Sequence, residues 1–294
     1  MYYIVYPILY LLSLLPWRVL YIISDGLYGL IYYIIGYRKE VVMSNLLIAF
    51  PEKTEGERTR IAKDFYRNLT DTIVETIKLL SLSEKSFLKR YETNNTLAAS
   101  FYQTGKNIQY HTGHFFNIEY VNIGESRRGP YPFVVVYMPI ANKAFDRMIY
   151  RMRTRYGAIL IPAGSFRTSF HQYVKDRYAL ALAADQNPGN PMAAYWVNFL
   201  GKPAPFTPGP EKGAKRNDTV VLYANFYRRK RGYFNIEVSL LTDEPRKFAD
   251  GELTKLFVQH LEKSIRERPA NYLWSHRRWK YTFDPEKHGK LLIE

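Results

Sequence analysis

Apolar residues run almost without interruption through the first 37 positions. Arg18 and Asp25 carry the charges in this stretch, and Pro7 and Pro16 divide it into two runs. Neither run is an unbroken span of about 20 apolar residues. The pattern predicts a membrane-anchoring segment over residues 1–37, either a spanning helix or helices that lie in the interface. A buried pair of soluble helices is the alternative.

Periodic apolar positions continue into residues 38–95. Phe50 and Pro51 are expected to end a first helix, because the residue before proline disfavours helical geometry. Beyond them the apolar residues recur every four positions, which predicts one packing face of a long helix: Ile61, Phe65, Leu69, Ile73 and Ile77.

Short apolar runs alternate with amphipathic segments from about residue 105 onward. Strands are predicted at 107–110, 133–137, 158–162, 178–184, 220–227 and 234–241. Helices are predicted near 141–155, 166–177, 210–217 and 251–267. Continuous apolar strands between helices indicate an α/β fold with a mostly parallel central sheet flanked by helices. Residues 38–294 are therefore expected to form one α/β domain with a helical lead-in.

Composition narrows the classes of partner and chemistry. Cysteine is absent, which excludes disulfides, thiolate metal sites and a cysteine nucleophile. The net charge of +15 favours anionic partners, and the 26 tyrosines favour a membrane interface. Because the basic residues are dispersed and form no recognisable module, nucleic acid is not expected as a partner. Phosphate-binding loops, dinucleotide fingerprints and the serine-hydrolase elbow are also missing from the sequence.

A histidine and an acid five residues apart follow the first predicted strand. His114 and Glu119 can meet only if His114 lies in a loop and Glu119 in the first turns of the next helix. Such strand-to-helix junctions host sites in open α/β sheets. A carboxylate on one imidazole nitrogen would leave the other nitrogen free to take a proton. His111 is expected to serve in a loop or in support of the site.

Three other polar clusters are candidates. Asp185 opens a turn at the end of a predicted strand, where a cleft would lie. Residues 198–210 are expected to form a stiff, proline-rich loop that opens a helix at Pro210 and suits an anion. Arg277 and Arg278 lie among tryptophans in residues 272–280, a composition that suits a phosphate-bearing or interfacial ligand.

Taken together and in this order, these blocks resemble the late acyltransferases of lipid A biosynthesis, the lauroyl/myristoyl transferase group of the lysophospholipid acyltransferase superfamily. The resemblance covers nearly the whole chain. It rests on Tyr37-Arg38-Lys39 with Asn45-Leu46 and Phe50-Pro51, the His114/Glu119 pair, Asp185-Gln186-Asn187-Pro188-Gly189, Phe199-Leu200-Gly201-Lys202-Pro203 through Gly209-Pro210, and Trp274-Ser275-His276-Arg277-Arg278-Trp279-Lys280.

The resemblance implies an enzyme of the bacterial inner membrane with its catalytic domain on the cytoplasmic face. It implies transfer of an acyl chain from acyl carrier protein, or from acyl-CoA, to a hydroxyl of a lipid A precursor, without a cofactor or metal. His114 and Glu119 match the family's catalytic pair, and Arg153 and Asp185 match family residues at the site. Met138 stands where many members have arginine, which puts the identity of the acceptor in question.

The mechanistic hypothesis is direct transfer. His114, oriented by Glu119, deprotonates the acceptor hydroxyl, and Arg153 or backbone N–H groups stabilise the oxyanion. One alternative keeps the chemistry but changes the acceptor to another glycolipid, an aminolipid or a lysophospholipid. A second alternative is a non-catalytic protein that binds anionic lipid. Oligomeric state and acyl length have no signature in the sequence.

Overall fold

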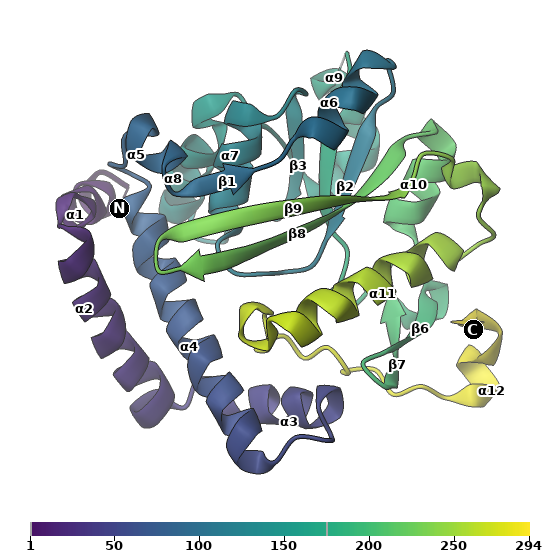
Figure 1. Cartoon of the computed structure of the whole chain (residues 1–294), viewed down its shortest axis with the longest axis horizontal. Helices are drawn as coiled ribbons and strands as arrows, with labels where there is room; N and C mark the ends of the chain where they lie inside the picture. The colour runs from purple at the N-terminus through teal and green to yellow at the C-terminus, as the bar shows by residue number, and fades with distance from the viewer. Residues whose placement is uncertain (1, 175) are drawn as a thin grey trace.

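The computed structural model describes residues 2–174 and 176–294, and for Arg167 it describes the backbone. A seven-stranded sheet is the centre of the molecule (Figure 1). Its strand order is β1-β9-β8-β2-β5-β3-β4, with bounds β1 Tyr91–Thr93, β2 Ile108–Thr112, β3 Phe133–Tyr137, β4 Ile159–Pro162, β5 Ala179–Ala183, β8 Val220–Lys230 and β9 Tyr233–Thr242.

The five strands from β8 to β4 run parallel to one another. β9 is antiparallel to β8, and β1 is parallel to β9. The predicted α/β fold with a mostly parallel sheet is therefore confirmed, and every predicted strand overlaps an observed one.

Helices cover both faces of this sheet. The longer helices are α1 Tyr2–Leu14, α2 Trp17–Gly29, α3 Lys39–Ala49, α4 Glu55–Lys78, α6 Thr96–Gln103, α7 Ile118–Arg128, α8 Lys143–Arg153, α9 Phe166–Tyr173, α10 Gly209–Asn217 and α11 Glu252–Glu267. The shorter ones are α5 Glu84–Leu88 and α12 Pro285–His288, with a π-helical turn η1 at Leu30–Ile35 and 3-10 turns η2 Thr154–Tyr156, η3 Ala163–Ser165, η4 Pro191–Ala193, η5 Pro245–Lys247, η6 Pro269–Asn271 and η7 Gly289–Leu291.

Two successive residues of β2 show which helices lie on which face of the sheet. The ring of His111 contacts Phe257 of α11, and Tyr110 points to the opposite face, near Glu125 of α7. Alternation of this kind is what a strand covered on both faces requires. His111 is 2% exposed within a strand, so the expectation that it lies in a loop is wrong.

A second sheet lies beyond α11 and consists of β10 Leu292–Ile293, β6 Tyr195–Phe199 and β7 Lys202–Phe206. β6 and β7 form a hairpin whose two turn residues both have positive φ, Leu200 at 51° and Gly201 at 84°. Residues 198–210 are therefore mostly a hairpin and not the loop that was expected. Two prolines fit in β7 because this strand forms the edge of its sheet.

The N-terminal helices lie along α4 at one side of the molecule, the purple end in Figure 1. Residues 17–35 form one helical stretch that is long and apolar enough to cross a membrane, and 17% of it is buried. Its inner side includes polar groups, because Tyr21 and Ser24 bond to α4, beside the buried Leu20. Its outer side includes large apolar residues, with Ile22 70% and Ile34 77% exposed.

Candidate functional site

The first part of the site is the turn between β2 and α7, called here the His114 turn (residues 113–117). Gly113 is needed at its start, because a Cβ there would lie 2.6 Å from Leu261. Backbone hydrogen bonds fix the turn from the far end of the chain. Leu273 N–H donates to His114 O at 3.1 Å, and Phe116 N–H donates to Asn271 O at 3.2 Å.

The second part comes from the end of the neighbouring strand. β2 and β5 are paired in register, with Thr112 opposite Ala183, so the loops that follow them leave the sheet side by side. Asp185 lies in the second loop with its side chain 2% exposed, and its Oδ1 is 2.5 Å from Nδ1 of His114. The topology thus brings together two residues that are 71 positions apart.

The electrostatics of this pair favour a charged hydrogen bond. Burial alone would lower the pKa of His114, but the charge and hydrogen bond of Asp185 outweigh it and the pKa is raised. Burial would raise the pKa of Asp185, but His114, together with a hydrogen bond from Tyr272, lowers it to about 2. Asp185 is therefore ionised near neutral pH, and it stabilises the imidazolium form of His114.

The other imidazole nitrogen, Nε2, is not engaged by the carboxylate. The His114 side chain is 29% exposed, and within residues 2–174 and 176–294 its Nε2 has no hydrogen-bond partner. A hydrogen bond to a carboxylate at Nδ1 selects the tautomer with Nε2 unprotonated. The arrangement can take a proton from a hydroxyl bound at the surface of the site.

Glu119 has a different partner from the one expected. It lies in the first turn of α7 and binds Arg153 of α8 through two hydrogen bonds, Nε to Oε2 at 2.8 Å and Nη2 to Oε1 at 2.5 Å. The carboxylate that orients His114 is therefore Asp185 and not Glu119. Both members of the Glu119–Arg153 pair are mostly buried, with side chains 10% and 19% exposed, so the pair fastens α8 to the start of α7.

The segment of residues 271–278 covers the site and is itself held by the helical lead-in. Arg38 donates to Ser275 O at 3.0 Å. Asn45 donates to the carbonyls of Trp274 and His276 at 2.8 and 2.7 Å. These contacts explain why sequence motifs at the two ends of the chain occur together.

The two candidate arginines in this segment have different surroundings. Arg278 is 1% exposed and donates to Asn187 Oδ1 at 2.8 Å and to Pro205 O at 2.9 Å, so it joins the Asp185 loop to the β6–β7 hairpin. Arg277 is exposed, which leaves its guanidinium accessible to an anion. The predicted contact with a ligand therefore fits the position of Arg277 and not the buried position of Arg278.

Sequence reasoning did not identify two side chains near the pair. Tyr272 is buried against Asp185, and His276 is half-buried, with burial and then Arg278 lowering its pKa to about 4. His276 is therefore neutral near neutral pH, and its Nδ1 has no partner in the described part of the chain. Both residues lie in the irregular segment between α11 and α12, where no periodic pattern predicts their position.

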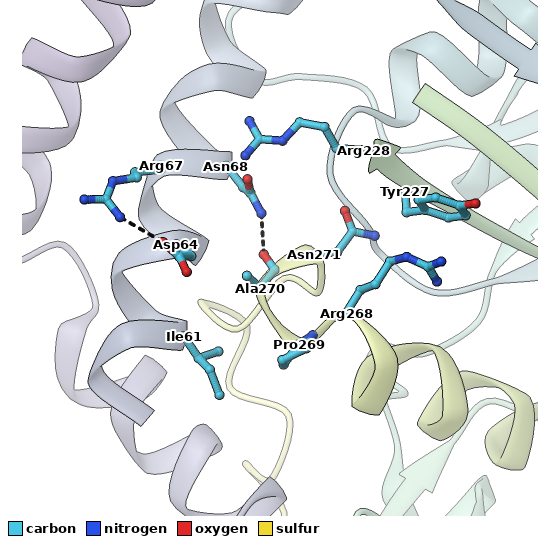
Figure 2. Close-up of a pocket in the computed structure, with 10 residues that line it drawn as sticks. All are labelled: Ile61, Asp64, Arg67, Asn68, Tyr227, Arg228, Arg268, Pro269, Ala270 and Asn271. Atoms are coloured by element: carbon cyan, nitrogen blue, oxygen red, sulfur yellow. Dashed lines mark hydrogen bonds and ion pairs between the residues drawn. The ribbon is translucent and has the colours of Figure 1, made fainter. Parts of the chain in front are cut away.

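A cavity of about 380 Å³ lies beside the site, between α4, the end of β8 and the η6 turn (Figure 2). Figure 2 shows the hydrogen bond from Asn68 to Ala270 that joins α4 to η6. The charged groups of its lining are Arg67, Arg228, Arg268 and Asp64. Each guanidinium already pairs with a carboxylate: Arg67 with Asp64, Arg228 with Asp71 and Arg268 with Glu267. Across the described residues, no cluster of three acid or histidine side chains could hold a metal ion.

Comparison with known proteins identifies the family. No curated protein matches this chain at a significant level. Residues 1–281 match the family model described as bacterial lipid A biosynthesis acyltransferase. That match includes the N-terminal helices, the His114 turn, the Asp185 loop and the whole of residues 271–278. The chain therefore belongs to the bacterial lipid A biosynthesis acyltransferase family and is an acyltransferase.

Proposed function

We propose that this enzyme transfers an acyl chain from a thioester, on acyl carrier protein or acyl-CoA, to a hydroxyl of a lipid A precursor. His114 is the general base and Asp185 orients it. The observation that carries this proposal is the 2.5 Å contact between Nδ1 of His114 and Asp185, in a histidine whose side chain is 29% exposed. Catalytic histidines bonded to a buried carboxylate take protons from hydroxyls in this arrangement.

The reaction is direct transfer. Nε2 of His114 takes the proton of the acceptor hydroxyl as its oxygen bonds to the thioester carbonyl carbon. The carbon–sulfur bond then breaks, and the leaving thiolate takes the proton back from the imidazolium. Arg153 gives two of its donors to Glu119. Its remaining nitrogen, Nη1, and the backbone amides of the His114 turn are the candidates for stabilising the oxyanion.

We propose that the N-terminal helices lie in the membrane interface on the cytoplasmic side of the inner membrane. Support comes from α2, which turns its polar groups toward α4 and its apolar residues outward. α4 carries many charged residues along its length, and a spanning α2 would draw it into hydrocarbon. α8 continues the same surface, because Arg151 bonds to Tyr2 of α1.

The identity of the acceptor depends on which residues of this chain can bind a phosphate. Met138 is 75% exposed beside α8, where many members have arginine. The exposed Arg277 is another position at which an acceptor phosphate would be bound. An acceptor without phosphate would leave this group unused.

The test is an assay of the purified enzyme with acyl donors of graded length and two acceptors, a lipid A precursor and a lysophospholipid, read by mass spectrometry. Replacing His114 by alanine should lower turnover by roughly 10²–10⁴-fold, the contribution of a general base. Near-normal turnover in this variant would contradict the mechanism. Transfer to the lysophospholipid alone would contradict the acceptor, and binding to anionic vesicles without any transfer would favour the non-catalytic alternative.

A further inference from the structure

A buried carboxylate outside the site joins three separate elements. Glu75 of α4 is 0% exposed. Its Oε1 accepts from the hydroxyl of Tyr21 in α2 and from the N–H of Gly232 in the β8–β9 turn, both at 2.9 Å. Its Oε2 accepts from Nδ2 of Asn117 at 2.5 Å. A carboxylate is tolerated inside a protein when donors of this kind satisfy it.

The third of these partners belongs to the His114 turn. Asn117 is the residue before α7, and its backbone is left-handed with φ 64° and ψ 40°. Asparagine tolerates this region better than most residues, but the conformation still has a cost that its surroundings must offset. Its side chain does not cap α7 and bonds to Glu75 instead. The bond therefore holds the bend between His114 and Glu119.

A second carboxylate one turn earlier stiffens the same support. Asp71 is 0% exposed and accepts from Ser24 Oγ at 2.6 Å, from Arg231 Nε at 2.9 Å and from Arg228. The two arginines offset the charge of Asp71, whereas the three donors to Glu75 are neutral. Helix α2, helix α4 and the β8–β9 turn are thus held as one unit against which Asn117 rests.

We propose that Glu75 is a positioning residue for acyl transfer, which holds Asn117 and through it the His114 turn against the unit formed by α2 and α4. This rests on the proposed function, in which His114 is the base. The packing of α2 on α4 then affects turnover, because Tyr21 of α2 donates to Oε1 of the same carboxylate that accepts from Asn117 at Oε2. Glu75 does not touch the substrate and acts through Asn117.

The test exchanges the acid and the amide of the hydrogen bond between Glu75 and Asn117. Asn117→Asp places a second carboxylate against Glu75 and should lower kcat by about 10²-fold with KM unchanged, because small misplacements of a catalytic group have costs of that size. Adding Glu75→Gln restores one donor and one acceptor at the same total charge. The double variant should regain about tenfold or more in kcat. Glu75→Gln alone is less informative, because the Asn117 amide can rotate by about 180° and accept a hydrogen bond from the new glutamine.

Asn94→Asp is the matched control. Asn94 accepts from Thr96 N–H before α6, and an aspartate oxygen can accept in the same way. This variant should keep the activity of the unmodified enzyme. Amide hydrogen exchange over residues 113–119 is measured in parallel, and it should be faster in Asn117→Asp and slow again in the double variant.

The outcomes separate this proposal from the proposed function. Loss of kcat and protection in Asn117→Asp, both recovered in the double variant, supports the positioning role. An unchanged kcat in Asn117→Asp, or a double variant no better than the single one, overturns it. If the unmodified enzyme transfers no acyl chain, the proposed function fails by itself, and recovery of exchange protection still decides whether Glu75 holds the turn.

Discussion

Replacing Asp185 by asparagine removes the charge that faces Nδ1 of His114 while keeping the size of the side chain. The carboxylate is 2.5 Å from the ring and almost fully buried, so water cannot take its place. In the proposed mechanism His114 becomes an imidazolium in the transition state, and Asp185 stabilises this charge. Loss of the equivalent carboxylate in serine proteases lowers kcat about 10⁴-fold. We expect a loss of about 10³–10⁴-fold here, or about 4–5.5 kcal/mol.

The assay is steady-state kinetics across a range of pH. KM should change little, because Asp185 is 1% exposed and is therefore not accessible to a bound substrate. Asp185 raises the pKa of His114. The acid limb of the kcat/KM profile should therefore move to lower pH in Asp185→Asn, since His114 must be neutral to accept a proton. Asp243→Asn, at an exposed acid, is the control. Turnover within about tenfold of the unmodified enzyme, with an unmoved acid limb, would refute the role given to Asp185.

Three further predictions concern stability. Glu119→Ala leaves Arg153 with a mostly buried, unpaired charge, so the unfolding free energy in urea should fall by about 3–5 kcal/mol; a fall under about 1 kcal/mol would show that the pair is not a fastening. Arg278→Ala should lower the thermal midpoint and Arg277→Ala should leave it unchanged, as differential scanning fluorimetry can check; equal effects would contradict their different burial. The lowered pKa of Asp185 gives stability that is complete above its ordinary value of 3.8 and is lost as pH falls toward about 2, so Asp185→Asn should show a shallower acid transition.

The sheet was predictable because its strands are continuous apolar runs. Parallel strands that are covered on both faces appear in the sequence as continuous apolar runs, without alternating polar residues. The helices at residues 143–153 and 252–267 were predicted from their amphipathic spacing. The β6–β7 hairpin was missed for a physical reason. Pro203 and Pro205 argue against a central strand, but they are compatible with the edge position of β7.

The neighbourhood of the site was predictable, but its pairing was not. His114 and Asp185 each follow a predicted buried strand, and the structure brings both to the same edge of the sheet because those strands are neighbours. Glu119 lies at that edge too, so two acids compete for one imidazole. The choice depends on Arg153, which takes Glu119, and on the left-handed bend at Asn117. Neither feature leaves a periodic signal.

The packing face of α4 was also only partly predictable. Ile73 was expected on the apolar face and is 40% exposed, whereas Asp71 and Glu75 are fully buried. Burial of two acids makes sense only when α2 and the β8–β9 turn supply donors to them. The partners of a helix in three dimensions therefore overrode its linear pattern.

The polar inner side of α2 has a practical consequence for handling the enzyme. Lys78 of α4 donates to the carbonyls of Ser13 and Leu15, and Asp71 and Glu75 draw on Ser24 and Tyr21. Truncation before residue 38, a common route to soluble crystallisable material, would strip partners from all three charges at once. The apolar N-terminal helices are thus part of the same folding unit as α4, and the intact polypeptide is the sounder form in which to purify the protein.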